Sequence, residues 1–442
     1  RAGCETGAMR VLHVMASGAR GGGGGQPVDP PPRRPRAGAG GRAGGGGRGG
    51  GGATGGLQGM ASAARGGGAA HLVDLLPALR RAGWDCEAAV GRDGPLGRDL
   101  AALDIPVRYV DLMGRRLAPL RALRLARLTA GPGPDVVHLH GTRTAFFHAV
   151  GAALRRVTAW RRGRVGPPPV VYTAHGLAYR KDAGRTGRQV SLWAERAACR
   201  GADAVTSVSR ADLADLQGRG FLGGRPGFHV ANAVKLPAND AGDRSAARRR
   251  LGLPDEALVV GTVSRLVPQK AVGDLVDAVA RIAPGFEGPA GPLTLVVVGD
   301  GPLRANLDRR VRAGANGARV MMMGARGDVP RLLPAFDLFV LSSRWEGEPI
   351  ALLEGMAAGL ACVATATEGA REILGDDTAS GRLVPVGDVS ALGDALAGLL
   401  RDARAREAMG ASARARVRAR TPDAQARRVA EVYRGLLAER AR

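Results

Sequence analysis

Residues 336–365 read FDLFVLSSRWEGEPIALLEGMAAGLACVAT, and this stretch decides the fold. Two short apolar runs, 336–343 and 360–365, have the length and composition of buried strands. Between them, Pro349 suits the first turn of a helix, where its missing N–H group leaves no hydrogen bond unmade. The order strand, helix, strand predicts two parallel neighbouring strands joined by a helix.

The same alternation runs through the chain in two series. Candidate strands of the first series lie at 9–16, 86–90, 134–140, 169–175, 202–209 and 228–232, and those of the second at 257–264, 293–301, 319–324, 336–343 and 360–365. Continuous apolar strands that alternate with helices are typical of parallel sheets covered on both faces. We therefore expect an α/β protein with two doubly wound, Rossmann-like domains. One helix also shows a capping pattern, Ser209 followed by Asp212.

The two series set the expected domain boundaries. We place an N-terminal extension at 1–8, the first domain at 9–235, a linker at 236–256, the second domain at 257–415 and a C-terminal helix that packs back across the domains at 416–442. The native start is expected at Met9, because the first strand begins there.

A low-complexity segment interrupts the first domain. Of residues 21–59, 19 of 39 are glycine, so this segment cannot bury a core and is expected to be disordered. The near-repeats MASGARGGG at Met15 and MASAARGGG at Met60 flank it. We interpret it as an insertion or an imperfect duplication within one strand–loop–helix unit.

Composition narrows the class of protein. The formal net charge is +24, and only three of the 64 basic residues are lysines, a bias that we attribute to genome composition. The charge is compatible with polyanionic partners, but no aromatic-interleaved basic motif favours nucleic acid. Four widely spaced cysteines fit a reduced, cytoplasmic chain rather than a disulfide framework or a zinc site. No apolar run approaches the ~18 residues of a membrane span.

Candidate ligand-binding residues follow the strands of the second series. In open parallel sheets, ligands bind beyond the carboxyl ends of the strands. Arg265 and Lys270 follow the strand at 257–264, and Lys270 lies just before the next helix. Two cations facing a helix N-terminus suit a diphosphate, although they could also be merely two exposed loop residues.

Two acids flank the helix that Pro349 opens. Glu346 lies in the loop before it and Glu354 in its second turn. Backbone N–H groups of residues 347–350 could meet an anion or sugar hydroxyls between the two carboxylates. Spacing alone leaves open the alternative that both acids only stabilise the helix N-terminus through its dipole.

The stretch EGEPIALLE, from Glu346 to Glu354, resembles the E-x7-E signature of the retaining GT-B glycosyltransferases of family 4. GTVSRLVPQKAVGDLVDAV, LVVVGDGPLRANL and GRLVPVGDVSALGDAL resemble the donor domain of that family, in the right order. ARGGGAAHLVDLLPALRRAGW, PDVVHLHG, VVYTAHG and HVANAV resemble its acceptor domain. The resemblance covers nearly the whole chain outside 1–8 and 21–59.

The resemblance implies a role for each residue that matches a family motif. Glu354 would bind the ribose, Glu346 would hold hydroxyls of the transferred sugar, and Arg265 and Lys270 would neutralise the departing diphosphate. His175 would lie near the donor sugar and the β-phosphate. The donor site would be completed by Gly347, Glu348, Pro349 and Ile350 and, at the opening of the first helix with Gly66, by Gly67 and Gly68. His138 and His140 are interpreted as cleft or packing residues, because no further metal ligands accompany them.

The resemblance also implies the reaction. A sugar would pass from a nucleoside diphosphate sugar, with UDP favoured over GDP, to a hydroxyl acceptor with retention of configuration. No D-x-D motif occurs in the chain, so we expect no metal and no cofactor beyond the nucleotide-sugar co-substrate. A lipid-linked acceptor, a role in cell-envelope, exopolysaccharide or glycolipid synthesis, and peripheral contact with the anionic inner face of the plasma membrane are expected; a nucleic-acid partner is not.

Three departures from the family pattern leave alternatives. Alanine occupies position 233 of the motif N-A-V-K and position 271 after Lys270, where glycine is usual, and Ala69 replaces a common acid. The insertion also enters at the turn that faces the donor. A catalytically silent nucleotide-sugar-binding protein on the same fold is therefore the main alternative. An epimerase on a related fold, or a basic nucleic-acid-binding protein, is more remote.

Overall fold

The computed structural model describes residues 9–15, 67–91, 95–110, 118–129, 133–158, 167–180, 184–237, 244–287, 291–375 and 377–442. The expected extension 1–8 and insertion 21–59, and Gly66, lie outside the described residues.

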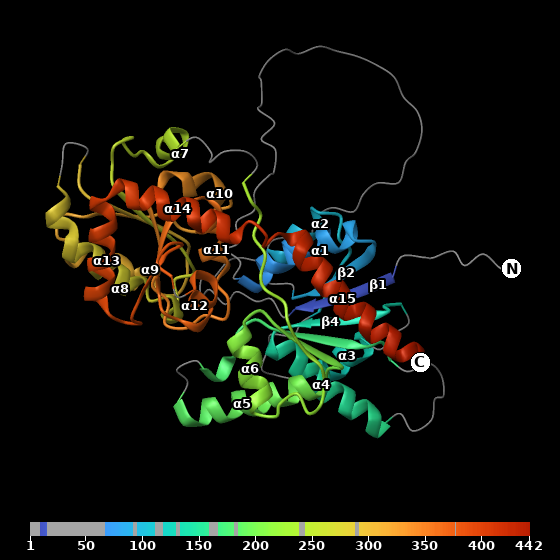
Figure 1. Cartoon of the computed structure of the whole chain (residues 1–442). Helices are drawn as coiled ribbons and strands as arrows, with labels where there is room; N and C mark the ends of the chain where they lie inside the picture. The colour runs from blue at the N-terminus through green and yellow to red at the C-terminus, as the bar shows by residue number, and fades with distance from the viewer. Residues whose placement is uncertain are drawn as a thin grey trace, which may run out of the picture.

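The first domain is built on a seven-stranded parallel sheet of order β3-β2-β1-β4-β5-β6-β7. Its strands are β1 (Met9–Met15), β2 (Trp84–Val90), β3 (Val107–Tyr109), β4 (Val136–His140), β5 (Val170–Ala174), β6 (Ala204–Ser207) and β7 (Gly227–His229). The helices are α1 (Gly67–Arg81), α2 (Leu96–Ala101), α3 (Ala118–Thr129), α4 (Thr142–Thr158), η1 (Ala178–Arg180), α5 (Gly184–Arg200) and α6 (Arg210–Gly218). Every residue of β4 and β5 is buried, because helices cover both faces of the sheet (Figure 1).

The second domain repeats this architecture on a six-stranded parallel sheet of order β10-β9-β8-β11-β12-β13. Its strands are β8 (Val259–Val263), β9 (Thr294–Val298), β10 (Arg319–Met322), β11 (Leu338–Leu341), β12 (Ala361–Thr365) and β13 (Arg382–Val384). The helices are α7 (Arg244–Leu251), η2 (Pro268–Lys270), α8 (Val272–Ile282), η3 (Ala283–Phe286), α9 (Arg304–Ala313), α10 (Val329–Leu332), η4 (Leu333–Ala335), α11 (Ile350–Ala357), α12 (Glu368–Leu374), α13 (Val389–Arg401) and α14 (Ala403–Val417). Separate apolar clusters fill the two sides of this sheet.

The prediction of two doubly wound parallel sheets is confirmed. Strands β3 and β13 were not predicted, because each contains an arginine, Arg108 or Arg382, and neither forms a continuous apolar run. The exact positions at which one domain gives way to the next stay predictions.

The last helix, α15 (Pro422–Ala441), lies on the first domain although it ends the chain (Figure 1). Its Val429, Ala430 and Tyr433 join the apolar cluster beneath α1. The Tyr433 ring is fully buried and meets the Trp84 ring edge to face, with ring centroids 5.1 Å apart. The chain therefore crosses between the domains twice.

An acid of the second domain caps a helix of the first. Ser209 Oγ accepts a hydrogen bond from the Asp212 N–H at 3.1 Å, which confirms the N-cap expected at α6. Asp212 does not complete the reciprocal capping box, because its carboxylate pairs with Arg180 at 3.0 Å. The Glu372 carboxylate instead accepts hydrogen bonds from Ser209 Oγ at 2.6 Å and from the N–H groups of Arg210 and Ala211 at 2.8 Å.

Ala271, at the junction of η2 and α8, has a left-handed backbone conformation, with φ 43° and ψ 40°. A side chain disfavours this region, since Cβ crowds the following carbonyl oxygen. Glycine avoids the clash, so the alanine at this position strains the turn that carries Lys270.

We expect Ala271→Gly to raise the free energy of unfolding by about 1 kcal/mol, because relief of the left-handed strain exceeds the entropic cost of glycine. Differential scanning calorimetry measures the shift of the transition that reports the second domain. Ala214→Gly, the same substitution at an exposed position within helix α6, is the matched control and should lower stability by about 1 kcal/mol. Destabilisation by both variants would show that Ala271 is not strained.

Candidate functional site

A cavity of about 210 Å³ opens between the two domains, beyond the carboxyl ends of β5, β8 and β11. Its wall includes, from the first domain, His175, Gly176, Leu177, Arg180, Asp212 and Asn232, and from the second, Val263, Ser264, Arg265, Gln269, Lys270, Trp345, Glu346, Gly347, Glu348, Pro349, Ile350, Ala351 and Glu368. Residues expected at the donor site from both halves of the sequence thus share one cavity.

Glu346 lies in the loop between β11 and α11, and its side chain is only 8% exposed. Its carboxylate forms an ion pair with the Lys270 ammonium group and accepts a hydrogen bond from Ser343 Oγ at 2.6 Å. Lys270 approaches from η2, which follows the neighbouring strand β8. The adjacency of β8 and β11 in the sheet is what brings the acid and the cation together.

The two expected phosphate-binding cations, Arg265 and Lys270, differ in whether a carboxylate already pairs with them. Arg265 follows β8 directly, is exposed to the cavity, and pairs with no carboxylate among the described residues. The Lys270 charge is balanced by Glu346. Arg265 is therefore the guanidinium that can receive an anion without first losing a partner.

The first turn of α11 supplies the next part of the wall. Pro349 is the N-cap and Ile350 the first helical residue, close to the expected helix start. Glu354 lies one turn further along α11 and is not part of the cavity wall in this structure.

The Glu348 carboxylate is buried between protein groups, and its side chain is 1% exposed. It accepts hydrogen bonds from the Asn232 backbone N–H and from the Arg420 guanidinium, and burial raises the pKa of this carboxyl against the opposing effect of Arg420. Asn232 Nδ2 also donates to the Glu348 carbonyl oxygen at 2.9 Å. The Glu348 side chain joins segments of the chain, while its backbone remains in the cavity wall.

Glycines let the two domains touch main chain to main chain. A Cβ atom built on Gly347 would lie 3.0 Å from Gly176 Cα and 3.2 Å from the His175 carbonyl oxygen. Gly67 and Gly68 are the first two residues of α1.

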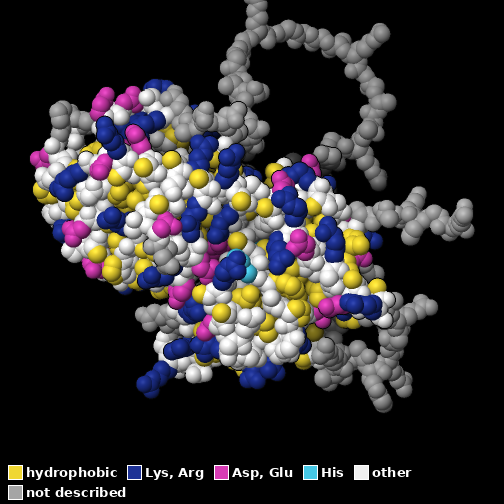
Figure 2. Space-filling model, viewed as in Figure 1, with side chains coloured by type: hydrophobic (Ala, Val, Ile, Leu, Met, Phe, Trp, Pro, Cys, Tyr) yellow, Lys and Arg dark blue, Asp and Glu magenta, His cyan; other side chains and the backbone are white. Residues whose placement is uncertain are grey.

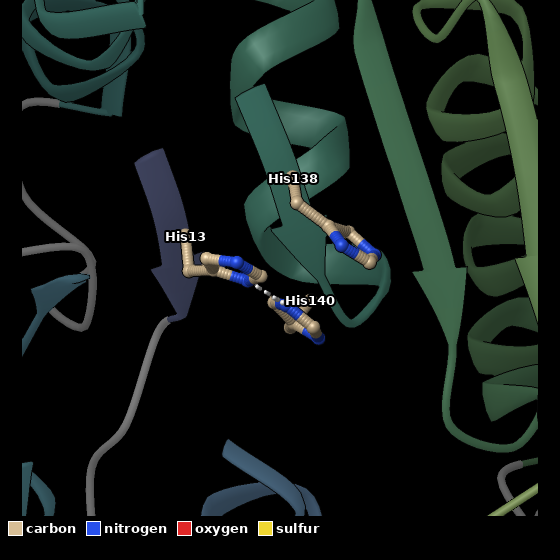
Figure 3. A group of neighbouring side chains, drawn as sticks. All are labelled: His13, His138 and His140. Atoms are coloured by element: carbon tan, nitrogen blue, oxygen red, sulfur yellow. Dashed lines mark hydrogen bonds between the residues drawn. The ribbon is translucent and has the colours of Figure 1, made fainter. Parts of the chain in front are cut away.

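His175 follows β5 and is partly exposed to the cavity. Its Nε2 shares a hydrogen bond with His140 Nδ1 at 3.1 Å, and His140 Nε2 shares another with His13 Nδ1 at 3.1 Å. Figure 3 shows His13 and His140 facing each other from the neighbouring strands β1 and β4, with His138 beside them. Neither His13 nor His71 was predicted from the sequence. The His71 ring packs edge to face on His175, with ring centroids 4.8 Å apart.

Burial keeps these rings neutral. It lowers the pKa of His13 to about 3 and of His71 to about 4, and it lowers the pKa of His138, His140 and His175 well below 6.5, with neighbouring imidazoles adding to the effect on most of them. All five are therefore uncharged at neutral pH.

Ring nitrogens of His13, His138 and His140 lie within 4.8 Å of one another, close enough to be considered as a metal site. However, both His138 nitrogens already have partners at 2.5 Å, Tyr433 Oη and Thr173 Oγ1. His13 Nδ1 and His140 Nε2 share a hydrogen bond with each other. The arrangement of these three rings is that of a hydrogen-bonded network within the first domain.

Four residues of the wall that were not predicted as site residues each carry a buried polar atom without a hydrogen-bond partner among the described residues. The atoms are Asp212 Oδ2, Asn232 Oδ1, Ser264 Oγ and Trp345 Nε1. Burial raises the pKa of Asp212 to about 7, against the opposing effect of the Arg180 guanidinium. Buried polar atoms without a partner are rare in folded proteins, so four of them around one cavity mark it as a candidate site. Ser264 and Trp345 could have been predicted as site residues, because they adjoin Arg265 and Glu346 in the sequence. No neighbouring motif places Asp212 at the site.

Two family models match the chain. The model described as "Glycosyl transferase 4-like domain" matches residues 66–226, and the one described as "Glycosyl transferases group 1" matches residues 243–416. Together they cover most of the chain.

Two curated relatives illustrate the similarity. An Escherichia coli UDP-Gal:alpha-D-GlcNAc-diphosphoundecaprenol alpha-1,3-galactosyltransferase is 29% identical over 66% of this chain and 75% of its own length. A D-inositol 3-phosphate glycosyltransferase of Salinispora tropica is 29% identical over 63% of each protein.

Solved structures share the fold. The Anabaena protein HepE, crystallised with UDP and glucose, has a TM-score of 0.72 at 21% identity, covering 97% of this chain and all of that one. Sucrose-phosphate synthase of Thermosynechococcus elongatus has a TM-score of 0.71 at 20% identity, covering 98% of this chain and all of that one. With both of its domains matched by family models and its two sheets arranged as in these neighbours, the chain belongs to the GT-B glycosyltransferases, with a glycosyl transferase 4-like domain followed by a group 1 domain.

Proposed function

We propose that the protein transfers a sugar from a UDP-sugar to a hydroxyl acceptor, with retention of configuration and without a metal ion. The observation that carries the proposal is the buried Glu346–Lys270 pair beside the free Arg265 guanidinium, in one cavity with His175. A UDP-galactose-using relative and a neighbour crystallised with UDP and glucose support the choice of nucleotide.

In the proposed reaction, Glu346 holds hydroxyls of the sugar. Lys270 and Arg265 stabilise the charge that develops on the diphosphate as the glycosidic bond to it breaks, which is where preorganised cations have most effect. Glu354 is assigned the ribose hydroxyls, and the first turn of α11 the remaining contacts.

A front-face mechanism accounts for retention. The acids in the cavity wall already have basic partners: Glu346 has Lys270, Glu348 has Arg420, and Asp212 and Glu368 have Arg180. None of them stands free as a nucleophile, so the acceptor attacks from the face that the diphosphate leaves.

We assign His175 a hydrogen-bond donor role toward the sugar or the β-phosphate. His13 Nε2 is buried without a partner, and an unsatisfied buried acceptor is less unfavourable than an orphan N–H group. With the His13 proton on Nδ1, His13 donates to His140, His140 donates to His175 Nε2, and the remaining proton of His175 lies on Nδ1. Neutral His175 thereby offers an N–H group to the cavity.

The acceptor is proposed to be lipid-linked, at the cytoplasmic face of the plasma membrane, in cell-envelope or glycolipid synthesis. The Escherichia coli relative that acts on a diphosphoundecaprenol substrate supports this choice. Within the described residues, no helix has the length and apolarity needed to cross a bilayer.

UDP should bind in the presence of EDTA and, at 100 times its Kd, add roughly 2.7 kcal/mol of stability in a thermal-shift assay. Arg265→Gln should weaken UDP binding about tenfold or more, since a charge-assisted hydrogen bond contributes about 1.5–3 kcal/mol. Arg309→Gln removes the same charge from an exposed position on α9 and should leave the shift unchanged. Stabilisation by GDP alone, or only with Mg²⁺ or Mn²⁺, would contradict the donor or the metal-independent mechanism.

Glu346→Gln should lower turnover about 100-fold or more without weakening UDP binding, because Glu346 is proposed to act on the sugar in the transition state and its neutralisation leaves the Lys270 charge unbalanced. Without an acceptor, slow hydrolysis of a panel of UDP-sugars can be followed by NMR, and the first-formed free sugar should keep the donor's anomeric configuration. An inverted product would rule out retention. UDP binding with no turnover above the solution background would favour the alternative that the protein binds a nucleotide-sugar without catalysing transfer.

A UDP-sugar should bind more tightly as the pH falls from 8 to 6, with a midpoint near 7. Asp212, whose pKa is about 7, loses its negative charge in this window, while the cavity histidines stay neutral. Loss of one nearby negative charge should favour the anionic ligand by roughly three- to tenfold. Isothermal titration calorimetry across this range should show the change, and Asp212→Asn should abolish it. An unchanged pH dependence in that variant would assign the titration to another group.

A further inference from the structure

Three adjacent helices on one side of the first sheet, α3, α4 and α5, have an unusual charge balance. Their sequences contain ten arginines and a single acid, Glu195. The Glu195 carboxylate is fully buried and accepts hydrogen bonds from Tyr172 Oη at 2.5 Å and Thr142 Oγ1 at 2.8 Å. Among the arginines whose side chains the structure describes, seven are exposed: Arg124, Arg127, Arg143, Arg185, Arg188, Arg196 and Arg200. The outward side of these helices, called here the basic face, therefore carries these arginines and no acid from the same three helices.

The same helices expose large apolar side chains. Of the eight exposed large hydrophobic residues in the described part of the chain, four lie on these helices: Leu120 (49%), Leu154 (40%), Val190 (61%) and Trp193 (61%). In the second domain, the described residues include just one such side chain, Val386. Exposed apolar groups concentrated on a single face mark an interaction surface.

Helix α5 combines both features on consecutive turns. Val190, Trp193, Arg196 and Arg200 follow one another at spacings of three and four, and all are exposed. With Arg185 and Arg188 also exposed, no guanidinium of α5 pairs with a carboxylate within the described residues. Figure 2 shows Lys and Arg side chains along the lower edge of the molecule, where Figure 1 places α4 and α5.

We propose that the basic face is the surface by which the protein docks on a membrane leaflet rich in anionic phospholipids. Arginine heads bind lipid phosphates while their apolar stems lie along the surface, and tryptophan favours the headgroup level. Nucleic acid fits less well, because the aliphatic side chains of Val190, Leu154 and Leu120 gain nothing from a phosphate backbone.

Docking on this face places the cavity close to the leaflet. Arg180 ends η1 and lines the cavity, and η1 packs against α5, so the cavity wall adjoins the basic face. This inference deepens the proposed function, since a lipid-linked acceptor held in the same leaflet would reach the cavity from that side.

Co-sedimentation with vesicles tests the proposal. The protein should bind vesicles of equimolar phosphatidylcholine and phosphatidylglycerol, and should bind vesicles of phosphatidylcholine alone far more weakly. Arg188→Gln combined with Arg196→Gln should lower the partition coefficient roughly 20- to 30-fold, at about fivefold for each arginine near the surface. Arg309→Gln combined with Arg312→Gln, which removes the same charge from exposed positions of α9, is the matched control and should bind as the parent does.

Tryptophan fluorescence tests the orientation. Emission assigned to Trp193, by difference from Trp193→Phe, should shift to shorter wavelength on mixed vesicles and be quenched by a brominated phosphatidylcholine. Equal loss of binding in both double-arginine variants, or no quenching of Trp193, would overturn the basic face as the docking surface. A DNA oligomer that binds with the same dependence on Arg188 and Arg196 and displaces the vesicles would assign the face to polyanions in general. The thermal shift with UDP, measured on the same variants, keeps failure of docking separate from failure of the proposed function.

Discussion

One buried carboxylate, that of Glu348, joins the two places where the chain crosses between the domains. It binds the backbone N–H of Asn232 on the outward crossing and the guanidinium of Arg420 on the return crossing, and the N–H of Val234 donates to the Arg420 carbonyl oxygen at 2.8 Å. Because Glu346 lies two residues away, the loop that carries it is built onto this junction. Any rotation of one domain against the other would therefore move the loop that carries Glu346.

The second constraint is the direct contact of main chains across the cavity. A Cβ atom on Gly347 would crowd Gly176, and one on Gly369 would lie 2.0 Å from the Gly347 carbonyl oxygen, which only a backbone shift could relieve. Gly347 is thus held between α12 behind it and the end of β5 in front of it. This contact sets how closely the loop of Glu346 approaches His175, independently of any side chain.

The sequence predicts those parts of the site that depend on local pattern. Apolar runs locate the strands, and the carboxyl ends of parallel strands converge, so Arg265, Lys270 and Glu346 could be placed together without a structure. The direct ion pair of Lys270 with Glu346, the Glu372 cap on α6 and the hydrogen bond between Tyr433 and His138 could not be predicted, because each depends on where individual side chains point and no local pattern encodes that. Asp212 shows the same limit: its spacing from Ser209 indicated a helix cap, whereas burial and Arg180 make it part of the cavity.

The pairing of Lys270 with Glu346 is consistent with catalysis, although it leaves Arg265 as the sole free cation among the described cavity residues. An ammonium group has three N–H donors, so Lys270 can keep one on Glu346 and direct others to a phosphate. The pair then fixes where the positive charge lies before the substrate arrives. The diphosphate of an intact nucleotide-sugar carries less negative charge than the diphosphate that leaves when the glycosidic bond breaks. A cavity whose cations are already partly balanced binds the intact nucleotide-sugar only moderately. In the proposed reaction, such a site would favour the leaving state over the bound substrate, which is the condition for acceleration.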